Sequence, residues 1–158
     1  MRHASKLNLL ALLGLALTTS CSTQAASRTD GFAGTWAYQK ACADKHSLSI
    51  DLSQSSAGAV TGDWSEGTRV RGSDGKLSGS VRDGKLHVRY CSTDSEAGYA
   101  ACPQMGDVED YFVLRGGNLV RFQKYGKDFK EDVTLHPASA GMEIPLDNKG
   151  CENTEDYL

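Results

Sequence analysis

The chain has 158 residues, of which 39% are hydrophobic, with 17 Lys and Arg against 20 Asp and Glu. This length suffices for one domain with a real hydrophobic core and is too short for two domains of ordinary size. The mildly acidic balance argues against nucleic acid as a partner, because a nucleic-acid-binding surface needs an excess of cations. The composition therefore indicates one domain whose partner is not nucleic acid.

The first segment, residues 1–20, has the pattern of an export signal. Arg2, His3 and Lys6 give it a positive start, and an apolar run over 7–17 follows. This run is shorter than the roughly 20 residues that cross a bilayer and matches the core of a secretory signal. We expect the signal to be removed and the mature chain to be exported to an oxidising space. Removal takes away two basic residues and no acid, which leaves 15 basic residues against 20 acidic ones.

Cys21 stands at the end of this signal, directly after Thr18, Thr19 and Ser20. Small residues before a cysteine are typical of bacterial lipoprotein signals, in which the cysteine is acylated and becomes the new N-terminus. Cys21 is therefore the predicted lipid anchor, which would be the chain's one link to a membrane, with the protein facing the periplasm from the outer membrane. The alternative is ordinary cleavage near Ala25, which would give a soluble periplasmic protein.

The remaining chain divides into a polar tether over residues 21–31 and a domain over 32–158. Four cysteines lie in the domain, and in an oxidising space four cysteines most often form two disulfides, with three connectivities open. They lack the close pairs of a metal site, so no metal is expected. We favour one disulfide that closes a long loop and one that ties the C-terminal tail to the first strand: Cys91–Cys102 and Cys42–Cys151.

Apolar and polar residues alternate along most of the domain, which is typical of strands with one buried face. In 46–53, for example, Leu48, Ile50 and Leu52 share a face. The dipeptides at 74–75 and 83–84 are both Asp-Gly, which favours tight hairpin turns. The pattern predicts strands near 33–41, 46–53, 58–65, 68–72 with 76–81, 85–91, 110–115, 119–125 and 129–136.

About eight strands joined mostly by short hairpins predict an all-β fold, an antiparallel up-and-down barrel stapled by disulfides. Closure is favoured because it leaves no strand edge unpaired, although a sandwich remains an alternative. Residues 137–158 form a polar C-terminal tail.

Gly34-Thr35-Trp36 in the first strand resembles the opening of calycins, the superfamily of lipocalins and avidins, and residues 59–64 are similar to the third strand of avidin-type barrels. The resemblance implies an up-and-down barrel that binds a ligand in its lumen or at its open end. It does not extend to the biotin-binding residues of avidins.

A looser resemblance concerns small periplasmic lipoproteins that inhibit lysozyme. Some of them are disulfide-braced barrels with a Ser-Gly-x-x-Tyr loop, and Ser95, Gly98 and Tyr99 offer these residue types with the glycine displaced from its place in the motif. This resemblance implies a loop that enters the cleft of a wall-degrading enzyme.

The loop between the strands at 85–91 and 110–115 is the candidate binding element. Residues 94–110 contain five acids and no Lys or Arg, and a disulfide would hold part of the loop rigid. Such a loop fits a basic protein partner. A plain solvated loop and a calcium site are the alternatives, although the EF-hand spacing is absent. The candidate partner-binding residues are Asp94, Glu96, Tyr99, Asp107, Glu109 and Asp110.

Two further groups have two interpretations each. Trp36, Trp64 and Tyr90, together with Phe122, fall on predicted inward positions, where they either fill the core or line a lumen for a small apolar ligand. A set of basic residues belongs to the charged exterior or lines the mouth, where it would hold carboxylates or phosphates: Arg69, Arg71, His87, Arg89, Arg121 and Lys124.

No motif of real catalytic specificity is present, so no catalytic residue and no cofactor are expected. The hypothesis is a non-catalytic exported binding protein, in its most concrete form a periplasmic inhibitor of a lysozyme-like or other wall-degrading enzyme. The alternative is a small-ligand carrier that uses the lumen.

Overall fold

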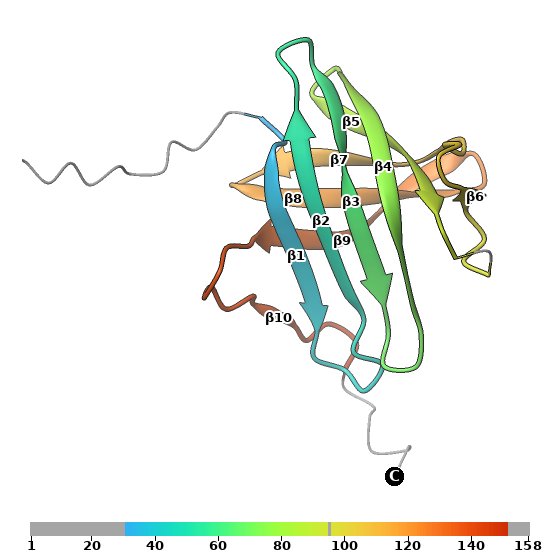
Figure 1. Cartoon of the computed structure of the whole chain (residues 1–158). Helices are drawn as coiled ribbons and strands as arrows, with labels where there is room; N and C mark the ends of the chain where they lie inside the picture. The colour runs from blue at the N-terminus through green and yellow to red at the C-terminus, as the bar shows by residue number, and fades with distance from the viewer. Residues whose placement is uncertain (1–30, 95, 152–158) are drawn as a thin grey trace, which may run out of the picture.

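The chain folds into a closed antiparallel β-barrel in a computed structural model that describes residues 31–94 and 96–151 (Figure 1). The predicted signal over 1–20, Cys21 and nearly all of the tether lie outside the described residues. The strands are β1 (Gly34–Lys40), β2 (Ser47–Gln54), β3 (Ala59–Gly67), β4 (Gly72–Arg82), β5 (Lys85–Ser92), β6 (Ala100–Ala101), β7 (Val108–Arg115), β8 (Asn118–Tyr125), β9 (Asp128–Pro137) and β10 (Leu146–Asp147).

Eight strands form the barrel in the order β1-β2-β3-β4-β5-β7-β8-β9. Each pairs antiparallel with the next, and β9 pairs with β1 at Trp36↔Pro137 and Ala37↔His136, which closes the ring. The short strands β6 and β10 add to β5 and β1 in parallel. The predicted all-β, eight-stranded barrel is confirmed. No helix in the described part of the chain could cross a membrane.

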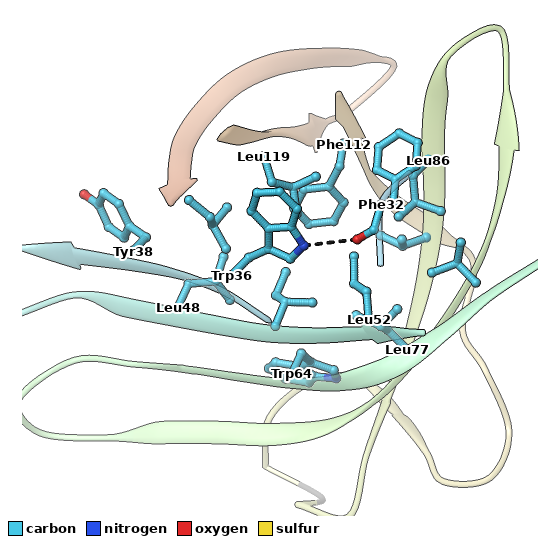
Figure 2. Close-up of a cluster of buried hydrophobic side chains, with 14 of the residues drawn as sticks. Phe32, Trp36, Tyr38, Leu48, Leu52, Trp64, Leu77, Leu86, Phe112 and Leu119 are labelled. Atoms are coloured by element: carbon cyan, nitrogen blue, oxygen red, sulfur yellow. Dashed lines mark hydrogen bonds between the residues drawn. The ribbon is translucent and has the colours of Figure 1, made fainter. Parts of the chain in front are cut away.

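The inward positions follow the alternation in the sequence. Leu48, Ile50 and Leu52 of β2 are at most 3% exposed, while the residues between them are exposed. Trp36 lies across the interior and donates a hydrogen bond from Nε1 to the carbonyl oxygen of Phe32 at 3.0 Å (Figure 2). Trp64 and Tyr90 are buried in the same hydrophobic cluster. These three aromatic residues therefore belong to a packed core.

Phe122 is not an inward residue, contrary to the prediction. Its ring stacks on that of Tyr111, with centroids 4.7 Å apart, and Tyr111 pairs with His87 on the outer face of β5. The two faces of β8 are hard to distinguish in the sequence, because the outer face has Val120 and Phe122 while the inner face has Arg121.

The turn predicted at Asp74-Gly75 is also wrong. β4 continues through these residues, with Asp74 opposite Ser65, and the chain turns at 68–71 instead. Gly75 has another role, because a Cβ at this position would overlap the carbonyl oxygen of Cys91 on β5. The turn at Asp83-Gly84 is confirmed, with φ angles of 50° and 72°.

Both predicted disulfides are present. Cys42–Cys151 joins the segment after β1 to the segment after β10, and Cys91–Cys102 closes the loop after β5. The barrel has two ends. We call the end at which β1 begins and the β4–β5 turn lies the tether end, and the end with the β3–β4 turn and the β5–β7 loop the mouth.

Candidate functional site: the mouth of the barrel

A groove of about 420 Å³ lies at the mouth. One wall is the end of β3 with the following turn, and the other is the acidic loop between β5 and β7. The lining residues with chemistry are Trp64 and Tyr99, the carboxylates Glu66, Asp94 and Glu96, and the bases His46 and Arg71.

The loop that forms the acidic wall is held at several points. The Cys91–Cys102 disulfide ties it to β5, and β6 adds pairing next to this disulfide. The Tyr99 ring packs against Trp64 and Tyr90, at centroid distances of 4.7 and 5.7 Å. At the start of the loop, the backbone N–H of Glu96 donates to the Asp94 carboxylate at 2.9 Å. These contacts hold the loop backbone and the Asp94 carboxylate in place.

Below the groove, Arg121 lies inside the barrel and is only 3% exposed. Its guanidinium donates two hydrogen bonds to Glu66, at 2.7 and 2.9 Å, and another from Nε to Asp132 at 2.7 Å. Arg121 lies on the same face of β8 as the core residue Leu119, and a register shift between β8 and β9 places two residues, Asp132 and Val133, opposite it. This β-bulge brings the Asp132 carboxylate to the guanidinium.

Asp110 is a third carboxylate near Arg121, with Oδ2 at 4.0 Å from the guanidinium. It is 2% exposed and accepts a hydrogen bond from the Tyr90 hydroxyl at 3.0 Å. A bulge in β7 brings Asp110 opposite Val88, an inward residue of β5. The other oxygen, Oδ1, is buried and has no hydrogen-bond partner among the described residues.

The pKa values reflect these surroundings. Burial would raise the pKa of Glu66, but hydrogen bonds from His46 and Arg121 outweigh it and lower the pKa to about 2. Burial raises the pKa of Asp110 to about 6, because the opposing effects of Arg121 and Tyr90 offset it only in part. Burial and the charges of Glu66 and Asp110 raise the pKa of Tyr99 in the wall of the groove.

The charge network behind the groove, which reaches the groove lining through Glu66, therefore has more negative than positive charge. One guanidinium faces three carboxylates, and His46 adds a hydrogen bond of 2.7 Å to Glu66. Asp94 and Glu96 contribute further carboxylates at the rim, against Arg71 on the facing turn. Such a site attracts a cationic group.

The structure brings together three of the six predicted partner-binding residues, because Asp94, Glu96 and Tyr99 line the groove. Asp107 and Glu109 are exposed on the same loop and at the start of β7, outside the groove lining. Asp110 requires a correction, because its buried side chain cannot touch a partner in this structure.

Sequence reasoning missed Glu66, His46 and Asp132. Of these three, only Glu66 could have been identified from the sequence, because it follows the inward residue Trp64 at a spacing of two and thus falls on an inward position. The six residues of the predicted basic set lie in different places in the structure. Arg121 is internal, Arg71 lines the groove, and the remaining members do not line it: Arg69, His87, Arg89 and Lys124.

The interior of the barrel is filled by side chains. Trp36, Leu48, Ile50 and Val88 belong to one buried cluster and are each at most 7% exposed. No observation therefore favours a small apolar ligand in the lumen. Within the described residues, no group of three or more metal-binding side chains is present, so the calcium alternative also gains no support.

The fold and mouth define a closed, eight-stranded antiparallel barrel that is compatible with a calycin-like fold. Comparison with protein-family models, with curated proteins and with solved structures finds no match to this chain.

Proposed function

We propose that this protein is a non-catalytic exported binding protein whose mouth takes up a basic segment of a partner protein. The most concrete form is a periplasmic inhibitor of a lysozyme-like or other wall-degrading enzyme of basic charge. The single observation that supports the proposal best is the groove of about 420 Å³, in which an acidic, disulfide-braced wall faces the carboxylate of Glu66.

Charge favours a basic partner. A Lys or Arg side chain that enters the groove would meet Asp94 and Glu96 at the rim and Glu66 in the facing wall, with the further carboxylates around Arg121 behind Glu66. Complementary charges speed up association and make binding sensitive to salt.

The bracing of the loop favours binding as well. Because the disulfide and the packing of Tyr99 already order the loop, a partner does not have to supply the free energy to order it. Tyr99 also offers a half-buried aromatic ring in the wall of the groove, and tyrosine is enriched among residues that dominate binding energy.

We further propose that the barrel is calycin-like and that the protein faces the periplasm. Gly34-Thr35-Trp36, with the indole packed inside the barrel, supports the first assignment. The pattern of residues 1–20 and Cys21 supports the second.

The test measures binding and inhibition with purified mature protein and a panel of basic lysozyme-like enzymes, at low and high salt. We expect binding that weakens at high salt, and a loss of at least about tenfold in affinity for Glu96→Lys and for Tyr99→Ala. Glu143→Lys makes the same charge change at an exposed position outside the groove and should bind like the wild type. Thermal unfolding of each variant establishes that it is folded.

Absence of binding to every enzyme at low salt would refute the inhibitor proposal. Equal weakening by Glu96→Lys and Glu143→Lys would instead show that overall charge, and not the groove, determines binding.

A further inference from the structure

The tether end of the barrel is where the preceding chain joins it. Phe32 is buried in the core, and its N–H donates to Gln54 Oε1 at the end of β2, at 2.9 Å. β1 starts there, beside the β2–β3 and β4–β5 turns (Figure 1). Ten residues, 22–31, separate Cys21 from Phe32 and can span at most about 35 Å. A lipid on Cys21 would therefore hold this end near the membrane.

A cluster of cations and aromatic rings begins at the same end, on the outer face of the barrel. Arg82 and Lys85 face each other across the β4–β5 turn, and both are exposed. Lys85 Nζ lies 4.8 Å from the centre of the Tyr111 ring, and Arg115 Cζ lies 5.9 Å from the centre of the Phe122 ring. We call these residues, with the neighbouring His87, the basic aromatic patch: Arg82, Lys85, His87, Tyr111, Arg115 and Phe122.

The patch has an excess of positive charge. Arg115 has a salt bridge to Glu131 at 2.9 Å, but neither Arg82 nor Lys85 has a carboxylate within 4.0 Å among the described residues. Even with the exposed Asp83 of the turn between Arg82 and Lys85, the cations outnumber the carboxylates of this surface, which favours a partner of negative charge. The stacked rings of Tyr111 and Phe122 are both partly exposed and add apolar area to this surface.

We propose that the tether end rests on anionic lipid headgroups, with the basic aromatic patch toward the bilayer and the mouth away from it. Lys and Arg side chains extend their charged groups to lipid headgroups, and aromatic side chains favour the same interfacial zone. β4 runs from the mouth at Gly72 to the patch at Arg82, about 30 Å, so the groove would face soluble partners. The orientation rests on the proposed Cys21 anchor, whereas the preference of the patch for anionic lipid does not.

The test uses the mature protein on lipid nanodiscs of phosphatidylcholine with or without phosphatidylglycerol, and a gadolinium chelate on some headgroups. The chelate broadens NMR signals of amides close to the membrane surface. We expect loss of the amide signals of 82–85 and 115–117 on anionic discs only, reversed by high salt, while the signals of 68–71 and 96–99 persist. Arg82→Glu with Lys85→Glu should abolish the loss, and Arg69→Glu with Lys127→Glu, the same charge change at the mouth, should leave it intact.

Signal loss at the mouth, equal loss on neutral discs, or equal effects of the two double variants would overturn the proposal. Binding of the patch to an anionic polysaccharide with no effect of anionic lipid would overturn it too. The mass of the mature N-terminus tests the anchor separately. If Cys21 has no acyl chain, the anchored orientation is refuted. The preference of the patch for anionic lipid is then tested with soluble protein added to the discs, by the loss of the amide signals of 82–85 and 115–117.

Discussion

Arg121 shows how much of the mouth depends on one side chain. It connects β8 to β3 and β9 through Glu66 and Asp132, and among the described residues it is the one cation within 4.0 Å of the buried Asp110 carboxylate. Its buried position was not evident from the sequence, because an arginine in a strand usually faces solvent. Burial became favourable only where the fold brought three carboxylates to one point.

Replacement of Arg121 by Met should destabilise the barrel strongly. Removal of one partner leaves buried carboxylates without compensation, which costs about 3–5 kcal/mol. Urea unfolding at pH 7 measures this loss in the free energy of unfolding. The loss should be smaller at pH 4, where Asp110 is protonated and carries no charge. A loss below about 1 kcal/mol at pH 7 would mean that the network contributes little to stability.

Asp110 should make the stability depend on pH between about 4 and 6. Its pKa is raised from 3.8 to about 6 in the folded state, so the folded protein binds this proton more tightly than the unfolded chain does. The free energy of unfolding therefore falls as the pH rises through this window, by about 2–3 kcal/mol. Glu66 acts in the opposite direction at lower pH, since its pKa is lowered to about 2.

The variant Asp110→Asn has no carboxyl group at this position and should remove the effect. The free energy of unfolding of the variant minus that of the wild type should increase by about 2–3 kcal/mol from pH 4 to pH 7. Urea unfolding at several pH values measures this difference. Because Glu66 is unchanged in the variant, its contribution cancels in the difference. A constant difference across the pH range would contradict the raised pKa of Asp110.

Among the strands, β3 and β4 depend on glycines where the backbones come close. A Cβ at Gly62 would overlap the carbonyl oxygen of Asp51 on β2, and one at Gly75 would overlap that of Cys91 on β5. The sequence pattern suggested a turn at Gly75, since Asp-Gly is a common hairpin dipeptide. Only the neighbouring strand shows that this glycine permits a close approach.

Gly62→Ala should therefore destabilise the barrel by at least about 2 kcal/mol, because β2 and β3 must move apart to accept the methyl group. Gly106→Ala is the matched control, since a Cβ there would lie 3.5 Å from its nearest neighbour, the Tyr90 carbonyl oxygen. We expect the control to stay within about 0.5 kcal/mol of the wild type in urea unfolding. Similar losses in both variants would refute the role of the close approach.

At the scale of the whole molecule, the two disulfides and the closed ring of strands brace the barrel. The β1–β9 pairing is short, and β10, tied by Cys42–Cys151, adds to β1 beside it. Such cross-links typically contribute about 2–4 kcal/mol each. The bracing keeps the mouth fixed at one end, while the chain toward Cys21 leaves from the other.

The anchor leads to a prediction for the full chain. If Cys21 is acylated, the mature protein should contain covalent fatty acid, label with a fatty-acid precursor and fractionate with membranes. Cys21→Ala should lose the label and the membrane fraction while both disulfides still form. A mature N-terminus near Ala26 in the wild type would contradict the anchor and leave the barrel unaffected.

The sequence by itself determined the all-β class, the approximate strands and the acidic loop, and it favoured the disulfide pairs that the structure shows. These features depend on local alternation, turn dipeptides and cysteine spacing, which are visible along the chain. The tertiary structure decided which polar side chains are internal. The bulge in β7 places Asp110 inside, the bulge in β9 brings Asp132 to Arg121, and no local pattern encodes such a meeting of β3, β7, β8 and β9.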